Sequence, residues 1–205
     1  MQRRWKHKML LENVQKRINL LDKNVVKMSS EQLHIMETKK DGEADLIINL
    51  QNPSILFEKL ENKKLGYFIN HCCADNVLLE YKDEKWILHI FELKRSVGTT
   101  EWDKIKEQFK GALQNAFALS GLLDIQMQME EIKVYTVYRN DKLNQQTNSV
   151  KQRMEMYEKK NLRTVTARNE WNAENVLLEV DKKYICKHTK IKLDVVTGEG
   201  VYTLI

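Results

Sequence analysis

The sequence predicts an α/β (α+β) fold in which a mixed β-sheet is flanked by helices. Two apolar runs, Val77–Tyr81 and Trp86–Phe91, lie on either side of a short polar turn, which predicts two paired strands. A long amphipathic helix is predicted over Glu101–Leu122, and another strand over Ile132–Tyr138. A strand, a helix and a strand in this order favour a right-handed crossover within one sheet.

The N-terminal part predicts a helix and a β-hairpin. Apolar residues recur at three- and four-residue steps over Arg3–Asp22, as on an amphipathic helix. The apolar runs Leu33–Thr38 and Asp45–Leu50 flank an Asp-Gly pair, which is a hairpin signal. Lysine and arginine residues decorate the helix, so we expect either a solvated face or a basic arm that contacts a nucleic-acid backbone or a partner.

Two short elements are expected between this hairpin and the central strands. Pro53 is predicted at the first position of a short helix, with Asn52 as its cap and Glu58 on its surface. Leu65–Ile69 then resumes a strand pattern.

The C-terminal part predicts further short elements. Thr99 or Thr100 is expected to cap the long helix, Lys151–Lys160 is predicted to be helical, and Thr164–Thr166 is predicted as a short strand. More strands are expected over Val176–Val180, Tyr184–Ile185, Ile191–Val196 and Val201–Ile205, the last two as a hairpin around Thr197–Gly200.

Composition favours one folded domain over residues 1–205. Charged residues make up 31% and apolar residues 42% of the 205 residues, as in globular rather than disordered proteins. The formal net charge of +5 permits contact with a polyanion without requiring it. The sequence contains no run of about 18 apolar residues, so no transmembrane helix is predicted. Three cysteines, two of them adjacent, favour a reduced cytoplasmic setting.

A cluster of acidic and basic side chains is predicted where the first central strand begins and the second one ends. Asp75 begins the first strand, and Glu92-Leu93-Lys94 ends the second. Because strand side chains alternate in direction, Glu92 and Lys94 point to the same side of the sheet. A hairpin would also bring Asp75 near them. Such a cluster at the end of a buried strand is costly without a partner such as a metal ion.

These residues resemble the PD-(D/E)XK nuclease superfamily. The resemblance covers roughly Pro53–Tyr138 and implies a restriction-endonuclease-like mixed sheet, with a core at about residues 53–140, an N-terminal helix and hairpin at 1–52 and a C-terminal extension at 141–205. Ala74 stands where the superfamily pattern has proline. The implied chemistry is Mg²⁺- or Mn²⁺-dependent hydrolysis of phosphodiester bonds, in which the cation stabilises developing charge and activates water.

The resemblance also implies a role for each residue of the cluster. Lys94 would assist the attacking water, and a polar residue on the following helix, Gln108 or Lys104, would join the catalytic set. The implied metal-binding residues are Asp75, Glu92, Leu93 and Glu58.

Other interpretations of these residues stay open at this stage. Glu80 or Asp83 would replace Asp75 if the hairpin paired in another register, and Glu61 would replace Glu58. Glu92 and Lys94 would also suit an ordinary exposed ion pair. His71 and His89 lie in apolar runs, which favours hydrogen-bonded core histidines over metal ligands. A zinc site would need His71, Cys72, Cys73, Cys186 and His188, whose spacing does not match known zinc motifs.

Two classes of function follow. The first is a nuclease acting on DNA, or less readily RNA, as a homodimer or as the effector of a larger defence or repair assembly, an expectation that rests on the resemblance. The second is a non-catalytic protein-interaction subunit on the same scaffold. In that case the long helix, with Trp102 and Phe117, and the segment around Met154 would dock a partner.

Overall fold

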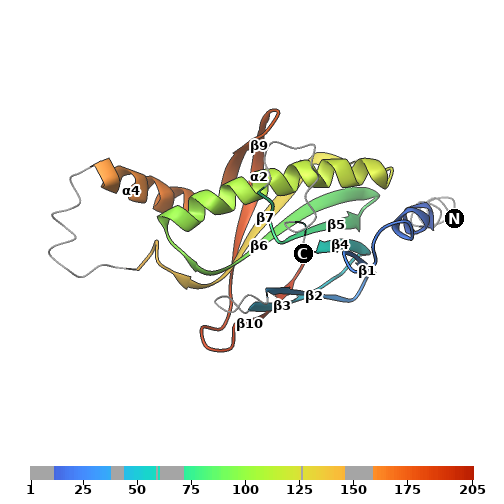
Figure 1. Cartoon of the computed structure of the whole chain (residues 1–205), viewed down its shortest axis with the longest axis horizontal. Coiled ribbons are helices and arrows are strands. Elements are labelled where there is room, and N and C mark those ends of the chain that lie inside the picture. The colour runs from blue at the N-terminus through green and yellow to red at the C-terminus, as the bar shows by residue number, and fades with distance from the viewer. Residues whose placement is uncertain (1–11, 38–43, 59, 61–71, 126, 146–158) are drawn as a thin grey trace.

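The computed structural model describes residues 12–37, 44–58, 60, 72–125, 127–145 and 159–205. Its fold is α+β, with two mixed sheets (Figure 1). The seven-stranded sheet has the order β1-β4-β5-β6-β7-β9-β8, and the three-stranded sheet has the order β10-β3-β2. The strands are β1 (Val26–Ser29), β2 (Gln32–Glu37), β3 (Ala44–Asn49), β4 (Ser54–Glu58), β5 (Asn76–Lys82), β6 (Lys85–Val97), β7 (Met127–Asp141), β8 (Asn175–Glu179), β9 (Lys183–Lys192) and β10 (Glu199–Thr203).

The central hairpin and the helix after it form as the sequence predicts. β5 pairs antiparallel with β6. Asp83 and Glu84 between them have φ of 51° and 63°, the left-handed conformation of a two-residue hairpin turn. Helix α2 (Thr99–Leu122) then leads to β7, which pairs parallel with β6. This strand–helix–strand unit is the crossover expected from the sequence.

The seven-stranded sheet is covered on both faces (Figure 1). Leu88 and Ile90 of β6 belong to the core cluster beneath α2, and α4 (Lys159–Asn172) packs beside α2 through Trp171. The alternate residues Phe91 and Leu93 belong to a second cluster beneath the three-stranded sheet. The side chains of β6 from Leu88 to Leu93 therefore alternate between the two faces by their parity.

Three local predictions are wrong, and tertiary packing explains the first two. Residues after Pro53 form β4, a wholly buried strand, in place of a helix, because Ile55 and Leu56 are buried on opposite sheet faces. Thr164–Thr166 lies inside α4, where the buried Ala167 and Trp171 hold the helix. No threonine side chain caps α2, whose N-cap is Gly98.

The predicted C-terminal hairpin is also wrong. β9 ends at Lys192, and a turn follows in which Asp194 Oδ1 accepts hydrogen bonds from the backbone of Val196 and Thr197 at 2.8 and 2.7 Å. The chain then crosses to the other sheet, where β10 pairs parallel with β3. The β2–β3 pairing itself is antiparallel, as predicted, but the turn residues 38–43 lie outside the described part, as do Leu65–Ile69, Glu61 and His71.

Helix α2 is fixed closely against the segment that precedes β5. A Cβ atom on Gly111 would overlap the carbonyl oxygen of Cys72. The backbone N–H of Ala74 donates to the carbonyl of Gln108 at 3.1 Å, and Asn115 Nδ2 lies 3.5 Å from Cys73 Sγ. Because glycine has no side chain, α2 can approach the backbone of Cys72 directly at Gly111.

Gly111→Ala is expected to destabilise the protein, because the added methyl group meets fixed backbone and not a mobile side chain. The cost should be about 1–3 kcal/mol, as for other overpacked sites. Gly121→Ala is the matched control in the same helix, since its Cβ would meet nothing within 4 Å. The control should be neutral or gain up to about 1 kcal/mol from helix propensity. Urea unfolding measures both, and equal effects of the two substitutions would contradict the prediction.

Candidate functional site

Asp75 and Glu92 lie opposite each other where β5 begins. Asn76 pairs with Phe91, so Asp75 continues the same register opposite Glu92. The backbone N–H of Leu93 donates to Asp75 Oδ2 at 2.8 Å, and the backbone N–H of Asp75 donates to Glu92 Oε2 at 3.2 Å. These reciprocal bonds hold the two carboxylates side by side on the sheet face beneath α2, the face shared with Leu88 and Ile90.

Lys94 joins this pair from the same strand. Its Nζ donates a hydrogen bond to Glu92 Oε1 and forms an ion pair with it. The Glu92 side chain is fully buried, whereas 26% of the Lys94 side chain is exposed. The site therefore has a buried carboxylate at its base and a partly exposed ammonium group toward solvent.

Burial shapes the electrostatics of the pair. It raises the pKa of Glu92 to about 8, and the negative charge of Asp75 raises it in the same direction, while Lys94 opposes both. Lys94 therefore offsets only part of the cost of two neighbouring carboxylates. A further cation at this point would favour the ionised form of Glu92.

The two candidate catalytic residues on α2, Gln108 and Lys104, differ in how they lie relative to this cluster. Gln108 Nε2 lies 3.4 Å from the carbonyl oxygen of Cys73, two residues before Asp75, so Gln108 borders the site. Lys104 lies one turn earlier on the same side of α2 and is exposed to solvent. Gln108 is thus placed to support the backbone that carries Asp75.

The remaining carboxylates do not join the cluster. Glu58 was expected on a helix but belongs to β4, where its Oε2 pairs with Lys27 Nζ at 2.6 Å. By strand alternation Glu58 faces the same way as Leu56, away from α2. Glu80 also faces away from α2, and Asp83 lies in the hairpin turn. The register thus places Asp75, and neither of these alternatives, beside Glu92.

Glu80 belongs to a separate buried network. Its Oε1 accepts a hydrogen bond from Asn52 Nδ2 at 2.7 Å, and its Oε2 lies 3.1 Å from His89 Nε2. His89 Nδ1 in turn lies 2.9 Å from the Tyr135 hydroxyl. His89 is therefore the hydrogen-bonded core histidine that its apolar surroundings predict.

The cysteines occupy separate places in the described structure. Cys73 and Cys186 are buried in the cluster beneath α2, and Cys72 is exposed. Burial raises the pKa of the Cys186 thiol to about 12, so it stays protonated at neutral pH. A protonated core thiol is unsuited to ligate zinc.

Sequence reasoning missed a buried polar pair beside Glu92. Thr136 of β7 lies next to Glu92 across the parallel pairing, and its hydroxyl lies 3.0 Å from His188 Nε2 of β9. His188 packs against Trp102 and Trp171, and burial lowers its pKa to about 4. No local signal in the sequence connects these residues, because they meet only through the order of the parallel strands.

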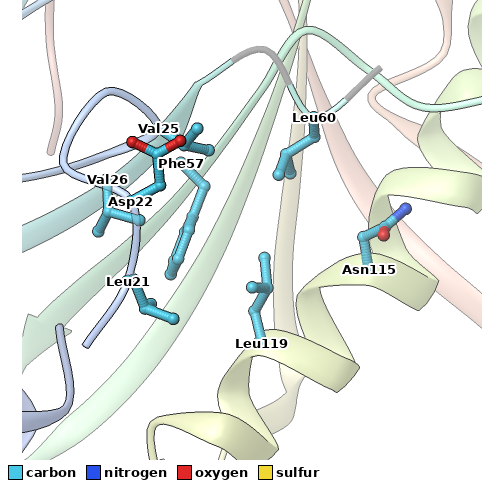
Figure 2. A pocket seen from close by; sticks show the side chains of 8 residues that line it. All are labelled: Leu21, Asp22, Val25, Val26, Phe57, Leu60, Asn115 and Leu119. Carbon is cyan, nitrogen blue, oxygen red and sulfur yellow. The ribbon is translucent and has the colours of Figure 1, made fainter. Parts of the chain in front are cut away.

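A cavity of about 170 Å³ lies between the C-terminal half of α2 and strands β1 and β4 (Figure 2). Most of its lining is apolar, with Asp22 and Asn115 as the polar members. Its other lining residues are Leu21, Val25, Val26, Phe57, Leu60 and Leu119. This composition suits apolar packing and not the binding of a phosphate group.

Comparisons with known proteins identify no relative: no family model, no curated protein and no solved structure matches this chain. Among the described residues, no three His, Cys, Asp or Glu side chains are grouped to hold a metal ion. Within the same ranges, no helix combines the length and apolar character needed to cross a membrane.

Glu92→Gln should change how stability depends on pH in the metal-free protein. The folded-state pKa of Glu92, about 8, exceeds its ordinary value of 4.5, so the folded protein holds a proton that the unfolded chain releases. Wild-type stability should therefore fall as pH rises from about 4.5 to about 8, at up to about 1.4 kcal/mol for each pH unit. The amide does not titrate, so the variant should gain stability relative to wild type across this window.

Urea unfolding in EDTA at about pH 5 and about pH 8.5 measures this difference. Glu179→Gln is the control, because the Glu179 side chain is 60% exposed. Parallel pH profiles for wild type and Glu92→Gln would show that the Glu92 carboxylate does not titrate in this range.

Proposed function

We propose that the protein is a metal-dependent nuclease that hydrolyses phosphodiester bonds in DNA. The observation that carries the proposal is the convergence of Asp75, Glu92 and Lys94 at one end of the central hairpin. Two buried carboxylates and a partly exposed ammonium group form a set suited to cation-assisted attack on a phosphate. RNA is the less favoured substrate.

The arrangement of elements supports a restriction-endonuclease-like fold for the core. The acidic strand β5, the Glu-x-Lys strand β6, helix α2 and the parallel strand β7 follow one another in the order that the resemblance implies. The cluster lies on the face covered by α2, so Gln108 borders it from the following helix. Lys104, on the exposed side of the same helix, is the alternative helix residue.

The donor set fits a hard divalent cation. Asp75 and Glu92 present carboxylate oxygens, which Mg²⁺ and Mn²⁺ prefer, and Mg²⁺ is commonly held by one or two carboxylates together with water. Burial, and after it the negative charge of Asp75, raise the pKa of Glu92 to about 8, so a bound cation would favour the ionised form of this carboxylate. Asp75 and Glu92 would hold the cation through their carboxylates. Leu93, between Glu92 and Lys94, would be an adjoining ligand through its backbone carbonyl oxygen. Glu58 does not fit this set, because it pairs with Lys27 on the other face.

The chain's own groups then have separate tasks. A bound divalent cation supplies Lewis-acid stabilisation of charge on the phosphate and lowers the pKa of bound water. Lys94, partly exposed beside Glu92, orients the water and carries charge toward solvent. The backbone N–H groups of Asp75 and Leu93 fix the carboxylates, so the site is organised before substrate arrives.

The alternative is a non-catalytic interaction subunit. Leu177 and Ile185 lie opposite each other on the outer face of the β8–β9 hairpin, and they are 49% and 73% exposed. An exposed cross-strand apolar pair is a reasonable contact for a partner protein. The same scaffold would then bind without cleaving.

Purified wild-type protein is expected to cleave DNA with Mg²⁺ or Mn²⁺ and to be inactive in EDTA. Glu92→Gln and Lys94→Met should each lower the cleavage rate by about 100-fold or more, because each removes a group that acts on the reacting centre. Gel assays with circular, linear and single-stranded DNA, and with RNA, measure the rate and the substrate class.

The matched controls are Glu179→Gln and Lys183→Met. Each removes one partner of an exposed glutamate–lysine ion pair in the β8–β9 hairpin. Both should retain wild-type activity. Inert wild-type protein with either metal, or the same residual cleavage in all variants, would favour the interaction subunit.

Metal binding can be tested without activity. Mn²⁺ is expected to raise the midpoint of thermal unfolding of the wild type in a concentration-dependent manner, because a ligand that binds only the folded state stabilises it. Glu92→Gln should lose most of this shift, and Glu179→Gln should keep it. An equal shift in all three proteins would place the metal elsewhere.

A further inference from the structure

A second cavity, with a mostly polar lining, lies at the turn end of the central hairpin, opposite the Asp75–Glu92 site. It has a volume of about 290 Å³ and is named here the hairpin-end pocket. Its lining residues are Lys82, Asp83, Lys85, Ile87, Glu131 and Lys133. Ile87 has the parity of Phe91, so the pocket lies on the sheet face away from α2. Five residues of strand, about 16 Å, separate Ile87 from Glu92, so the two sites are distinct.

A tight turn and a strand irregularity create the pocket. The turn at Asp83 and Glu84 forms one wall. On the other side, the β6–β7 register shifts between Trp86 and Leu88, whose partners are Met127 and Ile132. A shift of this kind disrupts the ladder locally and redirects side chains. The sheet therefore carries a recess at this point, with Ile87 as its apolar base.

Glu80, the cross-strand neighbour of Ile87, does not line the recess and already has hydrogen-bond partners within the protein. Burial acts to raise the pKa of Glu80, but hydrogen bonds from His89 and Asn52 outweigh it and hold the pKa below its ordinary value. Both oxygens of Glu80 thus have partners in the buried network. Glu80 offsets part of the positive charge nearby without occupying the pocket.

The lysines of the pocket are crowded together. Three lysines and two carboxylates line it, and Lys187 of β9 lies next to Lys133 across the parallel pairing. Burial lowers the pKa of Lys133, and Lys82 and Lys187 lower it further, against the opposite influence of Glu80 and Glu131. A half-buried ammonium group beside two like charges gains stability from an added anion.

We propose that the hairpin-end pocket binds the phosphate group of a small phosphorylated ligand. Lysine ammonium groups are established partners for phosphate. A recess of about 290 Å³ lies at the small end of the range for ligand pockets, which suits inorganic phosphate or a compact phosphate ester. The apolar floor at Ile87 accommodates the less polar part of such an ester. This inference does not rest on the nuclease proposal, because none of its residues belongs to the Asp75–Glu92 site.

Metal-free wild-type protein is titrated with inorganic phosphate, pyrophosphate and adenosine monophosphate at constant ionic strength, and backbone amide NMR shifts are followed. Saturable shifts are expected around Lys82, Ile87 and Lys133. Lys133→Met should weaken binding about tenfold, because it removes a charge-assisted hydrogen bond. Lys183→Met removes an exposed lysine outside the pocket and should leave the affinity unchanged.

If Lys133→Met fails to fold, Lys85→Met is the second variant, since Lys85 is exposed at the rim and its loss leaves the core intact. Tighter binding of adenosine monophosphate than of phosphate would assign the pocket to a nucleotide, and the reverse order would assign it to the free ion. The proposal is overturned if no probe saturates or if the lysine variants bind like wild type.

Discussion

The candidate site depends on the register in which β5 and β6 pair. The side-chain period of a strand is two, so a slip of one residue would turn Glu92 and Lys94 to the face of the three-stranded sheet and bury Phe91 beneath α2. The two-residue turn at Asp83 and Glu84 sets this register. Asp75 then lies opposite Glu92, 17 residues later in the chain.

The rest of the structure supports an arrangement that is unfavourable by itself. A buried carboxylate beside another carboxylate is destabilising unless nearby groups compensate for it. Lys94 and two backbone N–H groups supply part of that compensation. The extensive apolar packing beneath α2 holds the backbone in place around them. The chain thus carries an electrostatic cost at this point of a largely apolar core.

The sequence predicted correctly those elements in which a single pattern of apolar and polar residues dominates. The β5–β6 hairpin combines two apolar runs with a polar turn, and α2 carries a long amphipathic stripe, so both could be predicted. Sequence reasoning failed at β4, because a short run buried on both faces has no periodicity that separates strand from helix. Glu58 was misplaced for the same reason. The Thr136–His188 contact depends on the pairing of β7 with β9, which lie far apart in the sequence, so no local pattern records it.

The pairing of β10 with β3 has a consequence for how the chain folds. Glu199 lies opposite Asp45, so this parallel contact joins segments that are made early and late in synthesis. Contacts of such long sequence separation slow folding, because a large loop must close before they form. Until β10 is made, β3 has an open edge, and the apolar face around Phe91 lacks part of its cover. An intermediate that exposes this edge and this apolar face is therefore expected to be prone to aggregation.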